Sequence, residues 1–123
     1  MKYIDNKEVI NQINYYNKAT KTLSDWRNIY TDGDYLQRDG IIQRFEYCVE
    51  LWWKTMKIYL QYIWVENIIA SPKEVIKLAH KYKIIENDDI WFDFINCRNR
   101  LSHIYSEPDS DDIFDFICNN CSN

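Results

Sequence analysis

The chain contains almost no residues that interrupt a helix. Its 123 residues include only two glycines and two prolines, and no long stretch alternates apolar and polar residues as a half-buried strand does. At this length, with 46% hydrophobic residues, the chain can bury one core without a metal or a disulfide. The sequence therefore predicts one all-α domain over residues 1–123, an antiparallel bundle of four to five helices.

Two of the expected helices are long and three are shorter. The long ones cover residues 4–29 and residues 35–64, the second beginning at either Tyr35 or Asp39, with a turn between them in which Gly33 can take a positive φ. The shorter ones cover residues 72–82, a segment that Asn87 or Asp88 caps and that includes residues 91–105, and residues 108–117. Apolar residues at spacings of three and four define the buried faces. These faces include Ile10, Ile13, Leu23 and Ile29 in the first helix and Ile41, Phe45, Trp52, Met56 and Ile63 in the second.

Three residues favour the start of the third helix. The Ser71 hydroxyl can cap the first turn, Pro72 lies where its missing N–H costs nothing, and Glu74 can complete a capping box. In the same helix Lys73, Lys77 and Lys81 share one face. We interpret this stripe as a solvated surface rather than a track for phosphates.

The net charge of −4 and the isoelectric point near 5.1 argue against a strong general attraction to nucleic acid, so no DNA partner is expected. This charge does not exclude a small local site for RNA. The N-terminus has no apolar signal-peptide core, and the most hydrophobic run, residues 58–70, is too short and too polar to span a membrane. These features predict a cytoplasmic protein without membrane contact.

Cys118 and Cys121 have the C-x-x-C spacing of redox and zinc sites, but they lack the context of such sites. No second pair has this spacing, and no strand is predicted before it. We therefore expect reduced thiols in a frayed C-terminal tail, with Cys48 and Cys97 in the core. Neither a metal nor another cofactor is predicted.

The stretch R-N-R-L-S-H-I-Y, residues 98–105, concentrates side chains that can do chemistry. They are Arg98, Asn99, Arg100, Ser102, His103 and Tyr105. The unperturbed pKa of histidine suits proton transfer near neutrality, and the arginine fork binds phosphate oxygens bidentately. On one ideal helix Arg98 and His103 are about 140° apart, so a second protomer is one way to bring them together. The alternative is that these are ordinary capping and surface residues.

The spacing Arg98-x4-His103-x-Tyr105 resembles the signature of HEPN domains of the HepT type, which are the partners of minimal nucleotidyltransferases. Four further stretches resemble the same family in the same order: D-G-I-I-Q-R-F-E at 39–46, E-L-W-W-K at 50–54, S-P-K-E-V-I at 71–76 and I-W at 90–91. The resemblance implies a homodimer in which two copies of the motif face each other across one cleft.

The resemblance also implies an activity, that of a toxin that cleaves RNA without metal. Arg98, His103 and Asn99 would be catalytic, and Arg100 and Ser102 would be second-rank candidates that contact RNA. An MntA-like nucleotidyltransferase antitoxin would neutralise the toxin by adenylylating Tyr105.

Two other functions are compatible with the sequence. The domain could be a non-catalytic substrate-binding subunit of a small nucleotidyltransferase, which the acidic charge mildly favours, or a purely structural helical dimer. The intact pair Arg98 and His103 mildly favours the enzyme.

Overall fold

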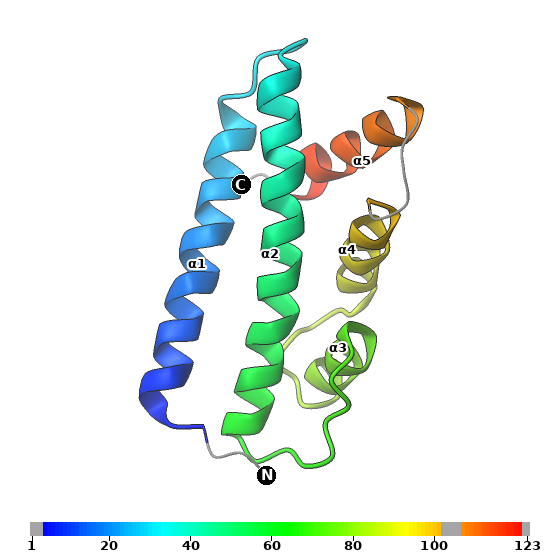
Figure 1. Cartoon of the computed structure of the whole chain (residues 1–123). Coiled ribbons are helices and arrows are strands. Elements are labelled where there is room, and N and C mark those ends of the chain that lie inside the picture. The colour runs from blue at the N-terminus through cyan, green and yellow to red at the C-terminus, as the bar shows by residue number, and fades with distance from the viewer. Residues whose placement is uncertain (1–3, 102–106, 122–123) are drawn as a thin grey trace.

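Every regular element in the part of the chain that the structure describes, residues 4–101 and 107–121, is an α-helix. The computed structural model contains α1 (Asn6–Asn28), α2 (Tyr35–Tyr62), α3 (Pro72–Lys81), α4 (Asp89–Arg100) and α5 (Glu107–Asn120). The long helices α1 and α2 run antiparallel, and α3, α4 and α5 follow one another along α2 from its C-terminal to its N-terminal end (Figure 1). The predicted all-α bundle of two long and three shorter helices is confirmed.

The turn between the two long helices also agrees with the prediction. Gly33 has a φ of 86°, in the left-handed region that glycine adopts without steric cost. Asp34 then caps α2 by accepting a hydrogen bond from the amide of Gln37 at 3.0 Å. The other end of α2 lies at Tyr62 rather than Trp64, and Trp64 itself has a positive φ of 66°.

The core is centred on α2, which packs against every other helix. Phe45 is completely buried, and its ring makes edge contacts with Trp52 and with Phe94 of α4 and Phe116 of α5. The predicted inward positions Ile41, Phe45, Trp52 and Met56 are confirmed by their burial, and Cys48, Val49 and Leu60 of the same helix are buried as well. Ile63, another predicted inward position, is instead 38% exposed because it lies just beyond the helix end.

The predicted apolar face of α1 is wrong in part. Ile10 and Ile29 are 57% and 68% exposed, whereas Val9, Ala19 and Leu23 are buried. The reason is that α1 packs mainly against α2, so only a narrow stripe of its residues needs to be apolar and buried. Small Ala19 allows close approach, and its carbonyl accepts a hydrogen bond from the thiol of Cys48 at 3.4 Å.

The start of α3 is as predicted: the Ser71 hydroxyl accepts a hydrogen bond from the amide of Glu74 at 3.4 Å, and Pro72 lies in the first turn. We expect Ser71→Ala to lower the free energy of unfolding by about 1 kcal/mol, because the amide loses its partner. Urea denaturation followed by circular dichroism measures this. Thr22→Ala is the control, since the Thr22 hydroxyl only bonds the carbonyl of Lys18 within α1. Equal denaturation midpoints for Ser71→Ala and wild type would refute the cap.

The last helix is longer than predicted, and the expected frayed tail is wrong. α5 continues to Asn120, and Cys121 packs against the core. Ile113, Ile117 and Cys121 repeat at intervals of four, so the apolar face gains one more turn than the prediction allowed. The side chain of Arg27 in α1 donates from Nε to the carbonyl of Cys118 at 3.2 Å, which ties this end of α5 to the long pair.

Candidate functional site at the end of α4

The last turn of α4 carries Arg98, and packing of the preceding turns holds that turn in place. Phe94, Ile95 and Cys97 are buried. Trp91 and Phe94 both contact the Trp52 ring of α2, with ring centroids 5.7 and 5.0 Å away. A side chain on such an anchored helix keeps a defined position, as a binding or catalytic group requires.

An ion pair joins Arg98 to α2. Nε of Arg98 lies 3.1 Å from Oε1 of Glu50, and the two side chains are 32% and 34% exposed. The Nε–H does not point at the oxygen well enough to form a hydrogen bond, so the contact is chiefly electrostatic. Glu50 is also 3.9 Å from the ammonium of Lys54, one turn further along α2. Glu50 therefore lies between two cations.

This arrangement leaves part of the Arg98 guanidinium available. Glu50 approaches at Nε, and no other side chain in the described part of the chain pairs with Arg98. Its two terminal nitrogens remain as donors, and these can form the parallel hydrogen bonds that a phosphate group accepts. The site can thus bind an oxyanion in a fixed orientation.

Asn99 and Arg100 lie in the same helical turn and are exposed. Arg98 and Arg100 both belong to the last turn of α4, where the negative end of the helix dipole stabilises cations. The sequence predicts that α4 continues to residue 105, but the structure ends it at Arg100 with Leu101 as the capping residue. Ser102, His103 and Tyr105 lie outside the described residues, so their predicted places on this helix stay predictions.

Glu50 and Lys54 are the residues that the sequence reasoning did not assign to a site. Their spacing of four marks a pair on one helix face. Spacing within one helix, however, does not show which side chain of another helix will approach. The contact between Glu50 and Arg98 joins residues from α2 and α4, and only the packing of these helices brings them together.

The chain matches the family described as nucleotidyltransferase substrate binding protein like, and the match extends over residues 11–121. The chain belongs to this family. The match includes all five helices apart from the first residues of α1, and it includes the whole of residues 98–105. No curated protein gives a significant match. Family membership confirms the coarser part of the resemblance inferred from the sequence, namely the link to nucleotidyltransferases.

The cysteines of this family member differ in their surroundings. Cys48 and Cys97 are buried, whereas Cys118 and Cys121 are partly buried. Burial raises the pKa of Cys48 to about 11 and that of Cys121 to about 12, so both stay protonated at neutral pH and are poor nucleophiles. Within residues 4–101 and 107–121, no group of three or more histidine, cysteine, aspartate or glutamate side chains is placed to hold a metal ion.

None of the described helices combines the length and the apolar character that crossing a bilayer demands.

Proposed function

We propose that this protein is the toxin of a HepT/MntA-type pair, a metal-independent endoribonuclease that a partner nucleotidyltransferase neutralises. The observation that carries the proposal is the family match across residues 98–105, where the Arg98-x4-His103-x-Tyr105 spacing lies. Support comes from the described geometry of Arg98, which is held by Glu50 through Nε and keeps its terminal donors for phosphate.

The proposed cleavage uses the 2′-hydroxyl of the RNA as nucleophile. His103 accepts the hydroxyl proton, the 2′-oxygen attacks the adjacent phosphorus, and the bond to the 5′-oxygen breaks as that oxygen receives a proton. Arg98 neutralises charge that develops on the phosphoryl oxygens, and Asn99 orients His103. In a homodimer the two His103 side chains supply one base and one acid, and Arg100 and Ser102 contact the strand. The products are a 2′,3′-cyclic phosphate and a 5′-hydroxyl.

The partner would act at Tyr105. An adenylate on this tyrosine places a phosphate near Arg98, where it takes up the donors that the RNA phosphate needs. We expect wild-type protein incubated with the nucleotidyltransferase and ATP to gain the mass of one adenylyl group as pyrophosphate is released, and to lose cleavage, whereas Tyr105→Phe gains no mass and stays active. Intact-protein mass spectrometry and an RNA cleavage assay measure the two effects.

The matched control for that experiment is Tyr15→Phe, which removes the hydroxyl of an exposed tyrosine on α1. It should be modified and silenced as completely as wild type. If Tyr105→Phe is also modified and silenced, the nucleotidyltransferase acts at another residue.

A second candidate is a non-catalytic subunit that binds substrate for the nucleotidyltransferase. The family description itself favours it. In this case the Arg98 cluster binds the phosphate of a nucleotide and nothing is cut. A stable complex with the nucleotidyltransferase, together with intact RNA in every assay, would select this function over the toxin.

A further inference from the structure

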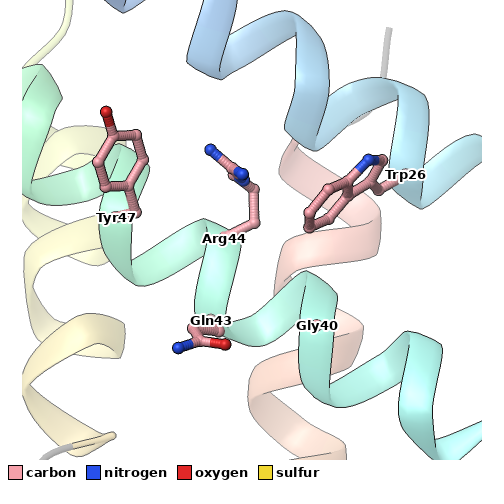
Figure 2. A pocket seen from close by; sticks show the side chains of 5 residues that line it. All are labelled: Trp26, Gly40, Gln43, Arg44 and Tyr47. Atoms are coloured by element: carbon pink, nitrogen blue, oxygen red, sulfur yellow. The ribbon is translucent and has the colours of Figure 1, made fainter.

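A pocket of about 380 Å³ opens on the α1–α2 pair, and the described residues that line it all belong to these two helices. The lining residues are Trp26 of α1 and Gly40, Gln43, Arg44 and Tyr47 of α2. Figure 2 shows the Arg44 side chain between the rings of Trp26 and Tyr47. The guanidinium carbon lies 4.7 Å from the centre of the Trp26 ring and 5.2 Å from that of Tyr47.

Arg44 has neither an acidic partner nor a hydrogen-bond acceptor among the described residues, which sets it apart from the other arginines of the long helices. Arg38 pairs with Asp111 of α5 at 2.6 Å, and Arg27 donates to the carbonyl of Cys118. The described contacts of Arg44 are with two aromatic rings instead. Cation–π contacts hold a guanidinium in place but leave its charge uncompensated. The pocket therefore combines a positioned cation with no anion of its own.

Contacts with two rings can leave the polar edge of the Arg44 guanidinium for a ligand. Aromatic contacts use the flat faces of a guanidinium, whereas its N–H groups point outward in its plane. An oxyanion such as phosphate can accept two of these N–H groups at once. The remaining surfaces of Trp26 and Tyr47 and the amide of Gln43 then surround whatever is attached to that oxyanion.

Gly40 contributes the open space. It lies inside α2, where glycine costs up to about 1 kcal/mol relative to alanine, and a Cβ built there would meet no atom within 4 Å. Packing therefore does not require glycine at this position. A side chain at Gly40 would instead take up room in the pocket that the glycine leaves empty.

We propose that this pocket binds a nucleotide unit, with its phosphate on Arg44 and its base against Trp26 or Tyr47. Bases stack well on aromatic rings and on guanidinium planes. The volume lies at the lower end of the range for ligand pockets, which fits one small ligand. Trp26 also lines an adjoining pocket of about 240 Å³ with Ile29 and Leu36, so the indole borders open space there as well.

The nucleotide could be free or part of an RNA strand, since both present the same phosphate and base. Tyr47 lies one helical turn from Glu50, the partner of Arg98. If the source is RNA, the pocket anchors the strand beside the Arg98 site, and the inference then deepens the proposed function. If the source is a free nucleotide, the pocket is independent of RNA cleavage.

Isothermal titration of the full chain with AMP, adenosine, inorganic phosphate and a hexa-adenylate strand tests the inference. We expect AMP to bind more tightly than adenosine or phosphate, because only AMP uses both the rings and Arg44. Arg44→Gln should weaken AMP binding about tenfold, and Gly40→Leu should abolish it by filling the pocket while the helix keeps its stability. Tighter binding of the strand than of AMP identifies RNA as the source.

Lys77→Gln is the matched control, since it removes one exposed positive charge from α3 and should leave binding unchanged. RNA cleavage by the wild-type chain is assayed separately from its binding of AMP, so failure of the ribonuclease proposal and failure of this one are distinguishable. The inference is overturned if neither AMP nor the strand binds at millimolar concentration, or if Gly40→Leu and Arg44→Gln bind as wild type does. Equal competition by a glutamate-rich peptide would instead identify a protein carboxylate as the ligand.

Discussion

Arg98→Gln should lower the rate of RNA cleavage about 100- to 1000-fold, the range seen when one donor to developing charge is removed. Glutamine keeps a polar side chain but is shorter than arginine, and it loses the positive charge and the bidentate fork. The fold should survive, since the ion pair with Glu50 is about one-third exposed and such pairs contribute little to stability. The measurement is cleavage of a mixed RNA substrate in excess chelator, with circular dichroism to verify folding.

The controls for this experiment test the histidine, a surface charge and the carboxylate beside Arg98 separately. His103→Ala should lose activity to a similar extent, whereas Lys77→Gln should retain it, because Lys77 lies on a solvated face of α3. Glu50→Gln should show an intermediate loss, since Arg98 keeps its charge but not the carboxylate that orients it. Equal activity of all variants would indicate a contaminating nuclease. Loss of activity on chelation would contradict metal-independent cleavage.

Phe45→Ala should lower the free energy of unfolding by about 3–5 kcal/mol, as truncation of a buried phenylalanine usually does. Phe45 has no exposed surface, and its ring contacts Trp52, Phe94 and Phe116, so its removal leaves a cavity where α2, α4 and α5 meet. Urea denaturation followed by tryptophan fluorescence measures the loss.

Leu36→Ala on the same helix is the control for Phe45→Ala, because Leu36 is 85% exposed. We expect it to change the free energy of unfolding by less than about 0.5 kcal/mol. A loss of under about 1 kcal/mol for Phe45→Ala would show that this position is not the centre of the core.

Local features of the fold could be predicted from the sequence because neighbouring residues decide them. Gly33 takes the positive φ of the turn, Ser71 caps α3 and Pro72 occupies its first turn, each through chemistry within a few residues. The inward face of α2 was also predictable, since a helix that contacts all the others buries a broad apolar stripe. The candidate motif at residues 98–105 stood out by its residue types alone.

Features that depend on which helices contact each other could be seen only in the tertiary structure. It exposed Ile10 and Ile29, because α1 packs mainly against α2, and it packed the partly buried Cys121 against the core, because α5 has a further apolar turn there. It also joined Arg98 to Glu50 and placed Arg44 beside Trp26, both pairs from different helices. Periodicity shows which residues share a helix face, but the neighbour of that face follows from the packing of the whole chain.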